Sequence, residues 1–143
     1  HNLYTMIHSC LDDEIIITLD GDDRLADEWV LHRLNEVYAS GDVWLTYGQF
    51  KLHPSGIMEW ACAMPEEIVR FNKFREFEHL PTHLRSFYAW LFKQIKLQDL
   101  LSYQDFYAMT WDMAMMFPMI EMAGKHHQFI ADVLYIYNEE NSI

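Results

Sequence analysis

Three aspartates, Asp20, Asp22 and Asp23, follow an apolar, β-branched run over residues 14–19. The run has the composition of a buried strand, and Gly21 would permit a tight backbone path directly after it. Carboxylates packed this closely repel one another unless a cation is present. Mg²⁺ and Mn²⁺ are commonly held by one or two carboxylates together with substrate phosphates. We therefore predict a metal site at Asp20, Asp22 and Asp23; the alternative is a solvated acidic turn that caps the next helix.

The elements around these aspartates alternate between helical and strand-like patterns. Helices are expected at residues 1–10, 27–38, 86–101 and 110–123, and strands at 14–19, 43–50 and 129–137. Strands that alternate with helices indicate an α/β fold with a mainly parallel sheet. In such a sheet we expect the 14–19 strand to be central, with the aspartates in the crevice at its carboxyl end, where open α/β sheets bind ligands.

Composition limits the classes of protein to consider. The chain has 143 residues, of which 51% are hydrophobic, so it can bury a core as one domain. Its formal charge of −12 argues against nucleic-acid binding, which requires basic surfaces. No apolar stretch approaches the ~20 residues of a membrane span. Cys10 and Cys62 have no metal-site or disulfide spacing, which favours reduced thiols and a cytoplasmic protein.

The ordered set of segments resembles a family 2 glycosyltransferase of the GT-A fold. The acidic motif Glu-Ile-Ile-Ile-Thr-Leu-Asp-Gly-Asp-Asp and the segment that begins at Asp112 are the most diagnostic parts of this resemblance. The remaining segments that match in order are residues 31–38, 44–48, 83–87, 129–130 and 134–138. The resemblance spans nearly the whole chain.

The resemblance implies a metal-dependent, inverting transfer of sugar from a nucleotide-sugar donor to the hydroxyl of a saccharide or other acceptor. Asp20 and Asp22 fall on the family's Asp-x-Asp motif, so Asp20 would lie near the ribose and the metal, and Asp22 would coordinate the ion that bridges the diphosphate. Asp112 falls on the general base that deprotonates the acceptor. Glu121 and Asp105 are the next candidates for this base.

The family usually begins with a strand, a helix and a second strand that hold the base and ribose, and none of these precedes His1. The resemblance therefore implies a single partial GT-A domain over residues 1–143, incomplete at its N-terminus and nearly inactive alone. In the longer parent protein, a membrane-peripheral position is compatible with the absence of a transmembrane segment here.

An acceptor-binding wall is expected from Trp60, His83 and Arg85, because aromatic faces suit sugar rings and polar side chains bind hydroxyls. The alternatives are a core position for Trp60, and a surface histidine and a solvated arginine for the other two. His79 and His83 have the spacing of a zinc pair on a helix, but Pro81 between them argues against a regular helix.

Other interpretations are weighed against these. The methionines between residues 109 and 122 indicate an adaptable core rather than a copper site. His126 and His127 follow Gly124 and are expected at the surface. A haloacid-dehalogenase-like phosphohydrolase, in which Asp20 would be the nucleophile, is the rival enzyme. A truncated transferase half that only binds a metal or a partner is the non-catalytic alternative.

Overall fold

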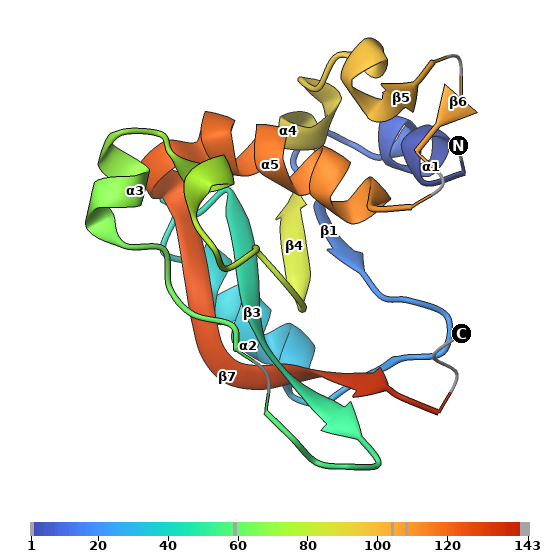
Figure 1. Cartoon of the computed structure of the whole chain (residues 1–143), viewed down its shortest axis with the longest axis vertical. Helices are drawn as coiled ribbons and strands as arrows, with labels where there is room; N and C mark the ends of the chain where they lie inside the picture. Colours follow the sequence, from blue (N-terminus) through green and yellow to red (C-terminus); the bar gives the residue numbers. More distant parts are fainter. Residues whose placement is uncertain (1, 59, 104, 108, 141–143) are drawn as a thin grey trace.

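The computed structural model describes residues 2–58, 60–103, 105–107 and 109–140 of the chain, and it has an α/β fold (Figure 1). The α-helices are α1 (Asn2–Ser9), α2 (Val30–Tyr38), α3 (Glu66–Arg70), α4 (Ala89–Lys93) and α5 (Trp111–Ala123). The strands are β1 (Ile15–Thr18), β2 (Arg24–Leu25), β3 (Leu45–His53), β4 (Arg85–Tyr88), β5 (Leu101–Ser102), β6 (Asp105–Phe106) and β7 (His127–Asn138). Single 3₁₀ turns are η1 (Phe74–Glu76), η2 (Leu97–Leu100) and η3 (Gly124–His126).

The main sheet is mixed, with the strand order β1-β4-β3-β7-β2, so the expectation of a mainly parallel sheet is wrong. In the described part of the sheet, β3 and β7 run parallel, β4 runs antiparallel to both β1 and β3, and β2 runs antiparallel to β7. The reason is the short β4, which inserts between β1 and β3 in the reverse direction. Among the described residues, β1 therefore lies at an edge of the sheet and not at its centre.

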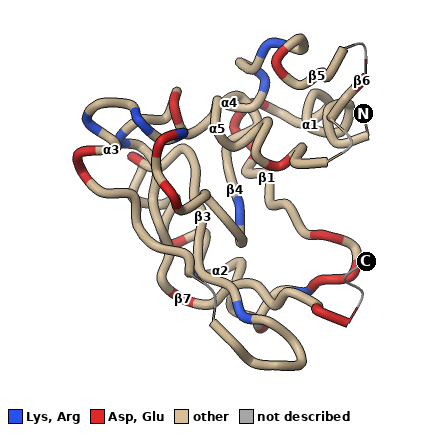
Figure 2. The backbone as a smooth tube through the Cα atoms, viewed as in Figure 1, with Lys and Arg blue, Asp and Glu red and all other residues tan. Residues whose placement is uncertain are grey.

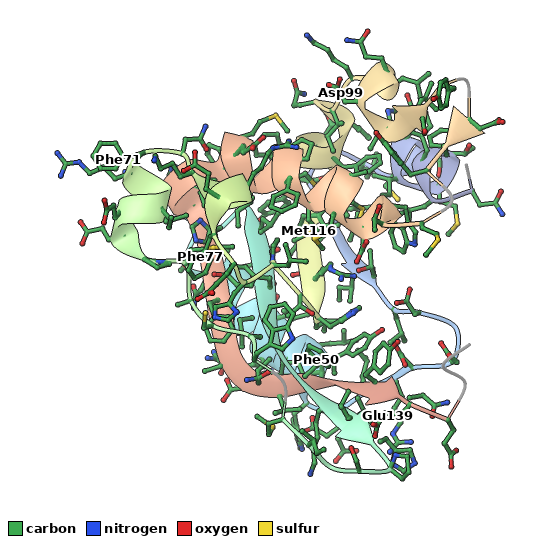
Figure 3. The ribbon with its side chains drawn as sticks, viewed as in Figure 1. Phe50, Phe71, Phe77, Asp99, Met116 and Glu139 are labelled. Carbon is green, nitrogen blue, oxygen red and sulfur yellow. The ribbon has the colours of Figure 1, made fainter. Side chains whose placement is uncertain are left out.

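The curled sheet has a hydrophobic core on each face. One core contains residues of β3 and β4 together with α1, α4 and α5, and the other joins α2 to residues of β3 and β7. Met115, Met116 and Met119 are buried in the first core, which confirms a core role for these methionines, and Met116 lies between α5 and the sheet (Figure 3). Met109 and Met122 are exposed.

The predicted helix over residues 86–101 is wrong, whereas the other predicted elements are found within a few residues of their expected bounds. Residues 85–88 form β4, and the helical part of the segment is confined to α4 and η2. Phe87 of β4 and the buried apolar residues of α4 lie in the same core, so the sequence pattern does not mark the change from strand to helix. No helix in the described part of the chain is long and apolar enough to cross a membrane.

Candidate functional site

The three aspartates lie in a turn that follows β1. Asp23 donates its backbone N–H to the carbonyl of Asp20 at 3.1 Å, which closes the turn. Acidic residues gather in this loop, close to the C-terminal end of β7 (Figure 2). Gly21 has no positive φ, and a Cβ there would meet no atom within 4 Å. The backbone at this position therefore does not require glycine, contrary to the tight path expected of it.

Asp23 is bound to the protein through both carboxylate oxygens. Its Oδ2 accepts a hydrogen bond from the Tyr135 hydroxyl at 2.5 Å, and its Oδ1 accepts one from the backbone N–H of Asn138 at 2.7 Å. Both donors belong to β7. Asp23 therefore anchors the acidic turn to the sheet, and its role as a metal ligand stays a prediction.

Asp20 is half-buried, and its carboxylate has no hydrogen-bond partner among the described residues. Burial raises the pKa of Asp20, and the nearby charges of Asp23, Asp112 and Asp22 raise it further, whereas the Arg85 guanidinium lowers it. The charges of Arg85 and Asp112 therefore act on Asp20, although both residues are distant from it in the sequence. Asp22, by contrast, is exposed.

Arg85 and Asp112 form a largely buried ion pair. The Arg85 Nη2 donates to Asp112 Oδ2 at 2.7 Å, and only 4% of the Arg85 side chain is exposed, against 28% for Asp112. Burial lowers the pKa of Arg85, and the charges of Asp112 and Asp20 oppose this effect. A solvated arginine was the alternative for Arg85, and it is wrong. Asp112 also accepts a hydrogen bond from the N–H of Met113, which fixes it at the start of α5.

His83 is buried beside this ion pair. Its ring stacks on Tyr135 with centroids 4.4 Å apart, and its Nε2 lies 3.5 Å from the Arg85 Nη2. Burial and the Arg85 charge lower the pKa of His83 to about 3, so the ring is neutral at physiological pH. Because the guanidinium can only donate, Nε2 carries the lone pair and Nδ1 carries the hydrogen. The surface alternative for His83 is therefore wrong.

Two buried polar atoms of the site have no hydrogen-bond partner in the described part of the chain: Thr18 Oγ1 and His83 Nδ1. Thr18 is the cross-strand partner of Arg85, so the two side chains lie on the same face of the sheet. Buried polar groups are nearly always paired, and unpaired ones are frequent at functional sites. Their position on both sides of Arg85 marks this face as the candidate site.

The segment before β4 fits closely against β3. Gly48 donates its N–H to the Thr82 carbonyl at 3.3 Å, and a Cβ at Gly48 would lie 3.0 Å from the Ile130 carbonyl oxygen and 3.5 Å from the His83 carbonyl oxygen. Only glycine permits this approach without movement of the backbone. Gly48 therefore contributes to the position of His83.

The carboxylate oxygens of the acidic turn are of the kind that bind a divalent cation. Asp20 and Asp22 supply hard carboxylate oxygens to which none of the described residues donates, which suits Mg²⁺ or Mn²⁺ held partly by substrate phosphates. Within the described residues, no group of three or more His, Cys, Asp or Glu side chains converges on a ligation geometry. These two aspartates would thus hold an ion together with a phosphorylated ligand rather than as a closed protein cage.

The structure brings together Asp20, Asp112, His83 and Arg85, but it does not join Trp60 to them. Trp60 is 46% exposed, so the core alternative for it is wrong, and it stacks on His79 with centroids 5.4 Å apart. In the part of the chain that the structure describes, it makes no ring contact or hydrogen bond with His83 or Arg85.

The alternative bases and the remaining histidines lie elsewhere. Glu121 is paired with Arg75, and Asp105 is exposed on the β5–β6 hairpin. His126 stacks on Trp44, and both His126 and His127 are half-buried, so they lie partly at the surface expected for them.

Sequence reasoning missed Tyr135 and Thr18. Tyr135 is completely buried, and its hydroxyl contacts both ends of the acidic turn. Its sequence context, an alternating strand near the C-terminus, gave no sign of this role. Thr18 lies within the apolar strand itself, where a single hydroxyl two residues before Asp20 was the available signal.

No protein-family model matches the sequence, and no curated protein matches it either. The fold and the site are therefore the basis for any functional conclusion.

Proposed function

We propose that this protein is a glycosyltransferase that transfers a sugar from a nucleotide-sugar donor to an acceptor hydroxyl, with inversion and with Mn²⁺ or Mg²⁺. One observation carries the proposal: the Asp-x-Asp aspartate Asp20 and the proposed base Asp112 interact with the same buried cation, Arg85. A transferase needs its diphosphate-binding carboxylate and its base on opposite sides of one reaction centre. The GT-A fold belongs to the same proposal.

Each residue has a distinct role in this proposal. Asp20 and Asp22 would hold the metal ion, which neutralises the charge that develops on the leaving nucleoside diphosphate. Asp112 accepts the proton of the acceptor hydroxyl as the hydroxyl oxygen bonds to the anomeric carbon and the bond to the diphosphate oxygen breaks. Arg85 holds the Asp112 carboxylate in place through their ion pair until the acceptor arrives.

His83 and Arg85 form the acceptor side of the site. His83 is neutral, and its buried Nδ1 has no partner among the described residues, so it would donate to a sugar oxygen once the acceptor displaces the side chains that cover it. Arg85 supplies the fixed positive charge between two carboxylates. We propose that Trp60 contacts the acceptor away from the reaction centre, because an exposed indole face can stack on a sugar ring. A cytoplasmic location is consistent with the two free cysteines.

Thermal unfolding with a panel of nucleotide sugars and Mn²⁺ tests donor binding, because a ligand that binds the native state raises the unfolding midpoint. The proposal expects one nucleotide class to protect wild type and Asp112→Asn equally, and to protect Asp20→Asn much less. Asp13→Asn is the matched control, since Asp13 is an exposed acid outside the site. If no nucleotide sugar protects the wild type, or if Asp20→Asn is protected as well as Asp13→Asn, the proposed donor site is wrong.

Turnover with the protecting donor then tests the base. In the full-length protein, Asp112→Asn is expected to lower turnover by about 100-fold or more, the scale of a lost general base. Near-normal turnover in Asp112→Asn would exclude Asp112 as the base and direct attention to Glu121 and Asp105. Donor protection without any transfer in the wild type would instead support the binding-only alternative.

A further inference from the structure

We infer that Tyr135 is a positioning residue that holds both ends of the acidic turn against β7 and so sets the place of the Asp20 carboxylate. The role assigned to Asp20 rests on the proposed function. The attachment itself rests on the geometry of the described residues.

The Tyr135 hydroxyl makes two contacts with the acidic turn, one as a donor and one as an acceptor. It donates to Asp23 Oδ2 at 2.5 Å, and its oxygen lies 3.4 Å from the backbone N–H of Asp20. An ionised carboxylate only accepts and a backbone N–H only donates, so the single hydroxyl proton must go to Asp23 and the oxygen must accept from Asp20. Burial and the hydrogen bond to Asp23 raise the pKa of Tyr135, which keeps this proton in place.

The strand that carries Tyr135 is itself firmly attached. β7 pairs with β3 along nearly its whole length and with β2 on its other side, where Tyr135 is the register partner of Leu25. The backbone N–H of Asn138 adds a second bond from β7 to Asp23. The turn from Asp20 to Asp23 is thus fixed at its beginning, at its end and at the strand that follows it.

The ring of Tyr135 connects this turn with the other half of the site. Its face stacks on His83 with an interplanar angle of 21°, and His83 in turn lies against Arg85. Tyr135 is fully buried and is therefore not a ligand-binding group. It acts through its neighbours: its hydroxyl sets Asp20 and Asp23, and its ring sets the distance of the turn from the Arg85–Asp112 pair.

Tyr135→Phe removes the hydroxyl and keeps the ring, and Tyr137→Phe is the matched control. Tyr137 lies two residues further along β7, and its hydroxyl has no hydrogen bond in the described part of the chain. The measurement is backbone amide hydrogen exchange of the whole protein, followed residue by residue. In Tyr135→Phe, exchange of the Asp20 and Asp23 amides is expected to become about tenfold faster or more, the effect of a lost hydrogen bond to a charged group. The amides of β3 should be unchanged.

A second measurement separates positioning from general stability. Mn²⁺ binding is followed by electron paramagnetic resonance with inorganic pyrophosphate present, well below the unfolding midpoint. Tyr135→Phe is expected to weaken Mn²⁺ binding severalfold, whereas Tyr137→Phe should not change it. Asp23→Asn is the second variant, and it keeps the shape of the side chain. It should also speed hydrogen exchange of the turn amides, so the test remains decisive if Tyr135→Phe does not fold.

The outcomes distinguish this inference from the proposed function. Unchanged exchange of the turn in Tyr135→Phe, or the same change in Tyr137→Phe, would overturn the positioning role. Faster exchange of the turn in Tyr135→Phe, in a protein whose wild type binds no Mn²⁺, would support the attachment and count against the metal-dependent function.

Discussion

The buried ion pair between Arg85 and Asp112 allows a quantitative test of the site. Removal of one partner from a buried pair costs ~3–5 kcal/mol, because the remaining charge is left uncompensated. Arg85 is only 4% exposed, but Asp20 still faces it when Asp112 is replaced, so we expect Asp112→Asn to lower the free energy of unfolding by ~2 kcal/mol. Arg85→Met should cost ~1 kcal/mol, because the 28% exposed Asp112 can recover water.

The double variant Arg85→Met/Asp112→Asn is expected to cost no more than Arg85→Met alone, which gives a coupling energy of ~2 kcal/mol. Urea unfolding at pH 7 measures all four proteins. Arg75 and Glu121 are the control pair: their two bonds of 2.6 and 3.0 Å are at least as good in geometry, but Arg75 is 59% exposed. The cycle of Arg75→Met and Glu121→Gln should give only about 0.5 kcal/mol. If the Arg85–Asp112 coupling is no larger than this, burial does not strengthen the pair and the reasoning is refuted.

Three further predictions concern stability. Gly48→Ala should lower the free energy of unfolding by ~1–3 kcal/mol because its Cβ meets a backbone carbonyl at 3.0 Å, whereas Gly21→Ala should change it by less than about 0.5 kcal/mol in the same urea titration. Because the pKa of Asp20 is raised in the native state, its ionisation opposes folding at pH values above the unfolded pKa of 3.8. Asp20→Asn should therefore have a larger free energy of unfolding than wild type at pH 7, and this gain should fade below pH 3.8. An equal gain in Asp22→Asn would contradict this reasoning. The pKa of His83 is lowered to about 3, so the native state loses stability as pH falls from 6.5 towards 3. The urea midpoint of His83→Gln should fall less steeply over this range than that of wild type. Parallel curves of urea midpoint against pH for the two proteins would exclude His83 as the cause.

Local sequence was sufficient to predict the strand over Ile15–Thr18, the acidic turn that follows it and the helix that begins at Trp111. The strand and the turn are determined by residues next to one another, a β-branched run followed by three acids, so their chemistry is readable without any distant partner. The same holds for the core methionines, whose burial follows from the apolar surface of a long helix.

The sequence did not determine the direction of β4 or the edge position of β1. Strand direction depends on which distant strands pair, and the four residues 85–88 are too few for a strand pattern to be separated from the helix that follows them. The identity of Arg85 and His83 as site candidates was available from the sequence, but their burial was not. Their burial depends on contacts with Asp112 of α5 and Tyr135 of β7, which are distant in the sequence.

The sequence by itself determined that this is an α/β domain with an acidic turn after a buried strand and a carboxylate at the start of a long apolar helix. Only the tertiary structure decided that these carboxylates share one arginine, that Asp23 serves as an anchor, and that Tyr135 holds the turn. The physical reason is the range of the interactions: strand and helix patterns arise from neighbours a few residues apart, whereas hydrogen bonds such as that between Tyr135 and Asp23 join residues far apart in the chain and exist only after the sheet has formed.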